Sequence, residues 1–181
     1  MKIKGLPYNF IVIDTIGDGN CFLHAILGGC NSLYDTKNEE GKKILVRQLR
    51  LDLAQLLDIN INNTTFYQKL SRGQLEEISK HIKEVNKEYM QAYLKSNHWL
   101  NSTFLEFFSM VFGINIIIIS SKEKDIYRTG DKELLFKKRN TIFINYIDQC
   151  HFETLGVQTK DGLKTIFHYD SKIIKTLNKL F

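Results

Sequence analysis

The sequence predicts an α+β fold with helices in the first part of the chain and a meander of strands in the second. Up to Gly113, apolar residues recur at the three- and four-residue spacing of amphipathic helices. Beyond Gly113, short apolar segments are separated by turn residues, as in consecutive strands. Because helices and strands follow in blocks rather than alternating, we expect layers of helix on sheet in place of βαβ units.

The clearest helix is predicted at residues 41–57, where leucine and isoleucine fall on one face. Gly28-Gly29 is expected to end an earlier helix that begins at a cysteine, and Gly113 to end a later one. Residues 171–181 suit a small amphipathic helix that packs on the domain. The other predicted helices cover residues 21–27, 74–95 and 102–113.

One short strand is predicted ahead of the helices and the others after them. A β-hairpin is expected at Asp161-Gly162, because this dipeptide favours the tight turns of two-residue hairpin loops. The predicted strands cover residues 10–13, 114–120, 125–128, 134–136, 141–146, 151–158 and 164–169. With one proline in 181 residues and no linker-like stretch, all elements are expected in a single domain, residues 1–181.

The composition excludes several classes of function. The formal charge is +5, but acidic residues are interspersed with basic ones, so no nucleic-acid partner is predicted. The longest apolar run, residues 116–119, is too short to span a bilayer, and the N-terminus lacks a signal segment, so no membrane partner is predicted. Three cysteines without paired spacing indicate neither a disulfide framework nor a zinc site. We expect a monomer in a reducing, cytoplasmic compartment.

Residues 17–26 place a cysteine directly after a glycine-interrupted polar loop and at the start of a predicted helix. There, Cys21 faces the unpaired N–H groups and the positive end of the helix dipole, which favour the thiolate. The glycines let the backbone bend so that the N–H groups of Asp18, Gly19 and Cys21 point to one place, as an oxyanion hole requires. Cys21 is therefore the candidate nucleophile of an acyl-transfer site.

A cysteine nucleophile needs a base, and His151, at the start of a predicted strand, meets this need. Residues i and i+2 of a strand share a face, so Glu153 is placed to accept a hydrogen bond from the imidazole and to fix its tautomer. Cys150 adjoins His151, but neighbouring strand residues point to opposite faces, and Cys21 is preferred as nucleophile. The orienting role has alternatives to Glu153, namely Asp148, Asn145 and Asp14.

The remaining histidines have no ligand-like spacing with cysteine or carboxylate. They are expected to be solvated or hydrogen-bonded side chains, and no metal is predicted. These residues are His24, His81, His98 and His168.

The run from Asp18 to Ile26, Asp-Gly-Asn-Cys-Phe-Leu-His-Ala-Ile, resembles the nucleophile motif of ovarian-tumour (OTU) deubiquitinases, which are papain-like cysteine peptidases. The run His151-Phe152-Glu153 resembles the later histidine motif of that family, although family members often carry Asp or Asn where this chain has Glu153. Trp99, followed by a helix and an apolar strand, is similar to the family's Trp, helix and central strand. The resemblance extends from about residue 10 to residue 155.

The resemblance implies a papain-like OTU fold with a central, mostly antiparallel sheet packed between helical regions. It also implies hydrolysis of isopeptide bonds after the C-terminal glycine of ubiquitin, with Cys21 as nucleophile and His151 as general base and acid. Asp18 is carried over with the motif and is expected to brace the loop without transferring a proton. Phe152 is expected in the wall of a channel for the substrate tail. For Trp99, a place in that wall competes with packing in the core.

Ubiquitin or polyubiquitin chains are the implied partners, with ubiquitin-like modifiers as further candidates, and the chemistry requires no cofactor or metal. Two alternatives stay open. Another papain-like thiol hydrolase would share the Cys-His pair but act on a different substrate, because the pair defines the chemistry and the surrounding surface defines the substrate. A non-catalytic ubiquitin-binding module would keep the fold and use only its surface.

Overall fold

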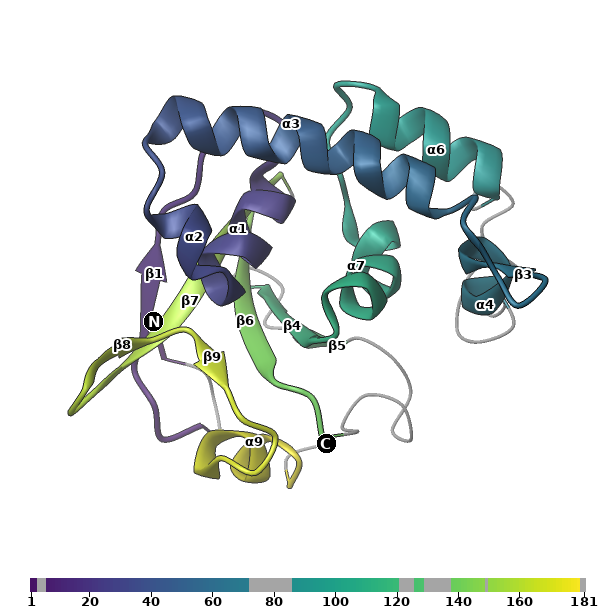
Figure 1. The fold of residues 1–181 in the computed structure, drawn as a ribbon. Helices are drawn as coiled ribbons and strands as arrows, with labels where there is room; N and C mark the ends of the chain where they lie inside the picture. The colour runs from purple at the N-terminus through teal and green to yellow at the C-terminus, as the bar shows by residue number, and fades with distance from the viewer. Residues whose placement is uncertain (3–5, 72–85, 121–125, 129–137, 149, 180–181) are drawn as a thin grey trace.

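The computed structural model describes residues 1–2, 6–71, 86–120, 126–128, 138–148 and 150–179, and its central feature is a seven-stranded sheet (Figure 1). The main path of the sheet has the order β1-β7-β6-β4-β5, while β8 pairs with β7 and β9 with β6. Of these pairings only β4 with β6 is parallel, so the sheet is mixed but mostly antiparallel. Its strands are β1 (Phe10–Ile13), β4 (Asn115–Ser120), β5 (Ile126–Arg128), β6 (Thr141–Ile147), β7 (His151–Thr159), β8 (Gly162–Lys164) and β9 (Ile166–Phe167).

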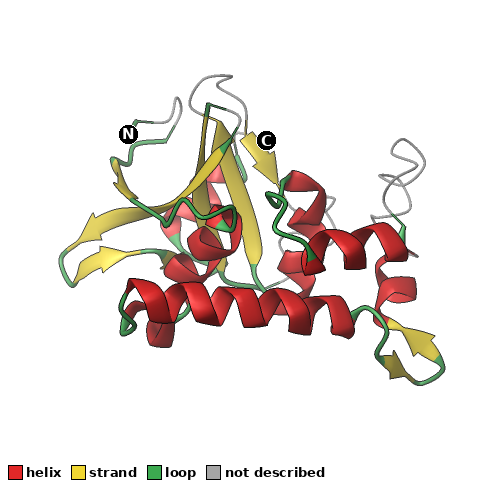
Figure 2. Cartoon of the chain, turned by 90° about the horizontal axis from the view of Figure 1, so that it is seen from above, coloured by secondary structure: helices red, strands yellow, loops and turns green. Residues whose placement is uncertain are grey.

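The helices of the first half lie on one side of this sheet, and a C-terminal helix lies on the other (Figure 1). The long helix α3 runs beside α6, and the β7–β8 and β2–β3 hairpins lie at opposite ends of the molecule (Figure 2). The described helices are α1 (Cys21–Cys30), α2 (Ser32–Asp35), α3 (Glu39–Leu56), α4 (Phe66–Ser71), α6 (Lys87–Lys95), the 3₁₀ helix η1 (Ser102–Phe104), α7 (Leu105–Phe112) and α9 (Lys172–Leu177). A separate two-stranded sheet consists of β2 (Asn60–Ile61) and β3 (Thr64–Thr65).

Strand β4 is buried along its whole length, because its alternate residues enter two different cores. Ile116 and Ile118 pack in the core that contains α1, α3 and α7. Ile117 and Ile119 pack in the core that contains Ile173 and other residues of α9. The predicted α+β fold, with its sheet between helical regions, is thereby confirmed, and α9 packs on the sheet as expected of the C-terminal segment.

The expectation that Gly28-Gly29 ends the first helix is wrong, since α1 continues to Cys30. A Cβ on Gly28 would lie 3.0 Å from Oγ1 of Thr154, and one on Gly29 would lie 3.2 Å from Ile142. These glycines therefore serve close packing of the helix on β6 and β7 rather than termination. Gly113, by contrast, does end α7, in the left-handed conformation with φ of +62°.

Most other predicted elements are present with small changes of boundary. A hairpin joins β7 to β8 one residue earlier than predicted: Thr159 pairs with Gly162, so Lys160 and Asp161 form the loop and Gly162, at φ of +114°, begins β8. The strand predicted at residues 164–169 is divided between β8 and β9, which pair with different partners. Of the helix predicted at 74–95, the described part is α6, while residues 74–85 and the strand predicted at 134–136 lie outside the described residues.

Candidate active site

Residues 14–20, here called the nucleophile loop, connect β1 to α1. The Asp18 carboxylate accepts a hydrogen bond of 3.0 Å from the N–H of Asn20, which closes a small turn ahead of the helix. Gly19 has a φ of +85°, which glycine adopts without steric cost. The Asp18 side chain therefore braces the loop, as expected. That the N–H groups of Asp18, Gly19 and Cys21 bind an oxyanion stays a prediction.

Cys21 is the first residue of α1 and is buried, with 5% of its surface exposed. Its Sγ donates a long hydrogen bond of 4.0 Å to the carbonyl oxygen of Cys150, the residue before His151, across a separation of 129 residues. Burial raises the pKa of the Cys21 thiol, and the negative charge of Asp18 adds to the rise. The predicted preference for thiolate at the helix end is thus outweighed by burial, and a base has to remove the proton.

His151 is the first residue of β7, and its half-buried imidazole lies beside the nucleophile loop. Its Cε1 lies 4.0 Å from the place that a Cβ on Gly17 would occupy. Its Nε2 lies 3.4 Å from Oγ1 of Thr15, whose hydroxyl also donates to the carbonyl oxygen of Phe152. The fold therefore brings together the two distant segments that carry Cys21 and His151. It also places Thr15 there, a residue that the sequence motifs did not indicate.

Glu153 lies two residues after His151 in β7, but its carboxylate has a different partner. Asn145 is directly opposite Glu153 in the register of β6 and β7, and its Nδ2 donates to Oε2 of Glu153 at 3.0 Å. Both side chains are buried. Within the described chain, the hydrogen-bond contact of the His151 ring is with Thr15. The carboxylate thus reaches across to the neighbouring strand, and its predicted orienting role stays a prediction.

Asp14 and Asp148 are the two other carboxylates that the sequence offered for the orienting role. Both side chains are exposed. Asp148 occupies the turn between β6 and β7 with a φ of +47°, and Asp14 follows β1 directly. Neither carboxylate therefore lies in a buried site that would fix the orientation of the imidazole.

His24 is fully buried in α1 and connects the nucleophile loop to α2. Its Nε2 faces Oδ1 of Asp18 at 3.2 Å, and its Nδ1 lies 2.7 Å from the hydroxyl oxygen of Tyr34. Burial lowers the pKa of His24 and outweighs the opposing effect of Asp18, so the ring is neutral at pH 7. Burial alone would raise the pKa of Asp18, but hydrogen bonds from Asn20 and the proximity of His24 lower it. A ring protonated at Nε2 fits these contacts, because its N–H faces the Asp18 carboxylate and its Nδ1 accepts from the Tyr34 hydroxyl.

The stability of the protein is expected to fall as the pH drops below about 6.5, because of His24. Its pKa in the folded protein lies below the ordinary value of 6.5, so the unfolded chain binds the proton first. The stability that the neutral His24 ring contributes is fully present above pH 6.5, and it is lost as the pH falls toward the lowered pKa of the folded state. Urea unfolding at pH 7.5, 6.5 and 5.5 checks this. His24→Gln should flatten the pH dependence, while His168→Gln, at an exposed site, should leave it unchanged; equal slopes in all three proteins would contradict the assignment.

Arg50 of α3 is a buried cation, 4% exposed, that joins three segments around the nucleophile loop. Its four hydrogen bonds go to Oδ1 of Asn20 at 2.7 Å and to the carbonyl oxygens of Tyr93 at 2.6 Å, Leu94 at 2.9 Å and His98 at 3.1 Å. Arg50 thus connects Asn20, directly before Cys21, to the C-terminal end of α6 and to His98, directly before Trp99. The sequence carried a signal for it, since Arg50 interrupts the apolar face between Val46 and Leu53.

Trp99 and Phe152, the two predicted substrate-binding residues, lie in contrasting environments. Trp99 is 58% exposed, and a Cβ on Gly19 would lie 3.1 Å from its Cδ1. Its indole therefore borders the nucleophile loop at the surface, and its predicted place in the wall of a substrate channel stays a prediction. Phe152 is 3% exposed and stacks between Phe22 and Tyr146, with ring centroids 4.4 and 4.6 Å away. The predicted place of Phe152 in a channel wall is contradicted by this burial.

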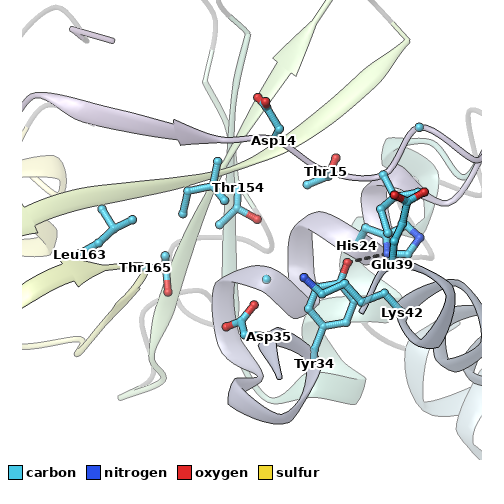
Figure 3. Close-up of a pocket in the computed structure, with 14 residues that line it drawn as sticks. Asp14, Thr15, His24, Tyr34, Asp35, Glu39, Lys42, Thr154, Leu163 and Thr165 are labelled. Carbon is cyan, nitrogen blue, oxygen red and sulfur yellow. Dashed lines mark hydrogen bonds between the residues drawn. The ribbon is translucent and has the colours of Figure 1, made fainter. Parts of the chain in front are cut away.

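A pocket of about 550 Å³ lies on the α2 side of the nucleophile loop (Figure 3). Among its lining residues, Asp14, Asp35 and Glu39 are acidic and Lys42 is basic. Its described lining residues do not include Cys21 or His151, although the loop is shared. Among the described side chains, no three of His, Cys, Asp or Glu gather as metal ligands would.

An α+β fold that brings a cysteine at a helix N-terminus to a histidine on a late strand is that of a papain-like thiol hydrolase. The family model described as OTU-like cysteine protease matches residues 16–152. The chain therefore belongs to the OTU-like cysteine protease family, which confirms the resemblance seen in its motifs. No curated protein matches the sequence.

Solved structures share this fold at low sequence identity. An OTU domain in complex with ubiquitin has a TM-score of 0.60 at 16% identity, with 94% of this chain and 81% of that chain covered. The viral OTU domain protease from Taggert virus has a TM-score of 0.51 at 18% identity, with 86% and 84% covered. The OTUD1 OTU domain has a TM-score of 0.51 at 16% identity, with 81% and 85% covered. These similarities establish the OTU fold for this chain. Among the described helices, none is long and apolar enough to cross a membrane.

Proposed function

We propose that this protein is a deubiquitinase that hydrolyses isopeptide bonds after the C-terminal glycine of ubiquitin. The observation that carries the proposal is the buried Cys21 thiol at the start of α1, 4.0 Å from the carbonyl that precedes His151. Membership of the OTU-like cysteine protease family supports the thiol chemistry. Similarity in fold to an OTU domain in complex with ubiquitin supports ubiquitin or its chains as the partner.

In the proposed reaction, His151 accepts the Cys21 proton as Sγ attacks the carbonyl carbon of the terminal glycine. The raised pKa of the thiol fits this order of events, because the proton leaves only when a base is in place. N–H groups of the nucleophile loop stabilise the oxyanion. His151 then protonates the departing lysine amine and afterwards activates water, which hydrolyses the thioester and restores Cys21.

The exposed indole of Trp99 is assigned to one wall of the path to Cys21. Its edge covers Gly19, so an extended peptide that reaches the thiol passes along this ring. Gly19 itself has no side chain to obstruct that approach. A substrate tail that ends in two glycines suits such a narrow passage, because it presents only backbone near the nucleophile.

The proposal is tested by incubating the protein with ubiquitin that carries a C-terminal electrophile and measuring intact mass. Wild-type protein should gain the mass of one ubiquitin, because the thiol attacks the electrophile where the glycine carbonyl would lie. Cys21→Ala should gain none, and it should also cleave no diubiquitin above background. Cys150→Ala is the matched control, since this exposed thiol adjoins the same site. It should form the adduct normally.

Three outcomes would contradict the proposal or its assigned nucleophile. An adduct that persists in Cys21→Ala but disappears in Cys150→Ala would make Cys150 the nucleophile. Absence of an adduct in folded wild-type protein, combined with Cys21-dependent labelling by iodoacetamide, would favour another thiol hydrolase. Ubiquitin binding without an adduct, measured by calorimetry, would favour a non-catalytic binding module.

A further inference from the structure

Thr15, in the nucleophile loop, contacts both the histidine and the strand that carries it. The antiparallel register of β1 and β7 pairs Ile13 with Thr154, and continuing it by two residues brings Thr15 opposite Phe152. The Thr15 hydroxyl donates to the carbonyl oxygen of Phe152, and the same Oγ1 lies 3.4 Å from Nε2 of His151. Thr15 thus follows the last paired residue of β1 by two positions, and its hydrogen bond to Phe152 fixes the hydroxyl beside the start of β7.

The direction of these two contacts follows from counting protons. A threonine hydroxyl has one proton, and a backbone carbonyl only accepts, so that proton points to Phe152. Toward His151, Oγ1 has only lone pairs to offer, and the group that faces them has to be Nε2–H. A neutral imidazole carries one ring proton, so protonation of Nε2 leaves Nδ1 without a proton and able to act as base.

We propose that Thr15 is the positioning residue that holds His151 in its Nε2–H tautomer and leaves Nδ1 to accept the Cys21 proton. The inference rests on the proposed thiol hydrolase function and assigns the orienting role that Glu153 was predicted to fill. The Glu153 carboxylate accepts from Asn145 instead. A hydroxyl orients the ring without placing a negative charge beside the imidazolium that forms during attack, unlike the carboxylate of a Ser-His-Asp triad.

The first test measures the tautomer itself and does not depend on turnover. Long-range ¹H–¹⁵N correlation spectra of protein labelled with ¹⁵N-histidine distinguish Nε2–H from Nδ1–H rings, and His151→Gln identifies the His151 signals. Wild-type His151 should be the Nε2–H tautomer at a pH where its ring is neutral, and Thr15→Val should give a mixture of tautomers. A Nδ1–H ring in the wild type would overturn the proposal. So would a spectrum that changes in Glu153→Gln and stays the same in Thr15→Val.

The second test is kinetic and uses diubiquitin or a fluorogenic ubiquitin substrate. Thr15→Val keeps the shape of the side chain, so kcat should fall roughly tenfold to hundredfold while KM changes little. Thr15→Ser restores the hydroxyl and should recover most of kcat. Thr154→Val is the matched control, because it too removes a threonine hydroxyl that donates to a backbone carbonyl, that of Ala25, away from the imidazole. Equal losses of kcat in Thr15→Val and Thr154→Val would reduce Thr15 to a structural role and reject the inference.

The two tests separate failure of this inference from failure of the proposed function. If wild-type protein neither hydrolyses ubiquitin substrates nor reacts with the ubiquitin electrophile, the proposed function fails whatever the tautomer of His151. If the wild-type protein is active, and the Thr15→Val variant has the same His151 spectrum and the same kcat, the function stands and only the role of Thr15 is wrong.

Discussion

Replacing Arg50 with methionine is expected to lower the free energy of unfolding by about 3–5 kcal/mol, the largest loss of stability that we predict for this protein. Methionine fills much of the arginine's volume but donates no hydrogen bond. The substitution removes the donor that the Asn20 amide oxygen and the carbonyls of Leu94 and His98 share, while the Tyr93 carbonyl still accepts from Ser96. Each unsatisfied buried acceptor costs about 1–3 kcal/mol, and relaxation recovers part of the sum.

Urea unfolding followed by circular dichroism measures this loss as a shift of the midpoint at constant slope. Arg47→Met is the matched control, because it makes the same substitution one turn earlier on the exposed side of α3. It should change stability by less than about 0.5 kcal/mol. Arg50→Lys should fall between the two, since an ammonium cannot reach all four acceptors at once. A loss below about 1 kcal/mol in Arg50→Met would show that the network is not the link between α3, α6 and the nucleophile loop.

Gly19→Ala is expected to lower kcat/KM for a ubiquitin substrate by about a hundredfold or more, the range for loss of an oxyanion donor. A side chain at φ of +85° is strained, and the new Cβ would lie 3.1 Å from Cδ1 of Trp99 and 3.4 Å from the carbonyl oxygen of Asn97. The loop or the indole has to move, which displaces the N–H groups ahead of Cys21. Steady-state hydrolysis with a folded variant measures the effect.

Gly113→Ala provides the control for backbone strain alone. Gly113 also has a positive φ, of +62°, but a Cβ there would meet nothing within 4 Å, and the residue lies at the end of α7. Both variants should lose about 1 kcal/mol of stability, the cost of a left-handed conformation for alanine. Only Gly19→Ala should lose activity. Near wild-type kcat/KM in Gly19→Ala would mean that the loop does not hold the oxyanion.

Local patterns predicted the secondary structure well where periodicity was strong and boundaries were marked. Strand β1 was predicted at its observed bounds, and α3 begins two residues earlier than predicted because the Asn38 side chain caps it by accepting from the Gly41 N–H. The hairpin of β2 and β3 was missed, although Asn62 and Asn63 at positive φ are typical hairpin-turn residues. The mostly polar residues 60–64 indicate only the end of the preceding helix, because the strands of this hairpin have two residues each, too few to show an alternation of apolar and polar side chains.

The motif around Cys21 and the late His151 were sufficient to predict the family and the candidate nucleophile and base, because their chemistry depends on residue type and order along the chain. The side chains that form hydrogen bonds to these segments could not be predicted from residue type and order. Thr15 and Arg50 reach the site from a strand end and from a distant helix, and only sheet register and helix packing place their polar atoms there.

Burial is the property of single residues that the sequence does not decide. Phe152, expected in the wall of a substrate channel, packs in the core, and Trp99, for which the wall and packing were both open, lies at the surface. Residue type and spacing determined the family, the order of the elements, and the candidate Cys-His pair. The tertiary structure decided which side chains are accessible and which acceptor each donor meets, because exposure and hydrogen bonding depend on contacts between segments far apart in the chain.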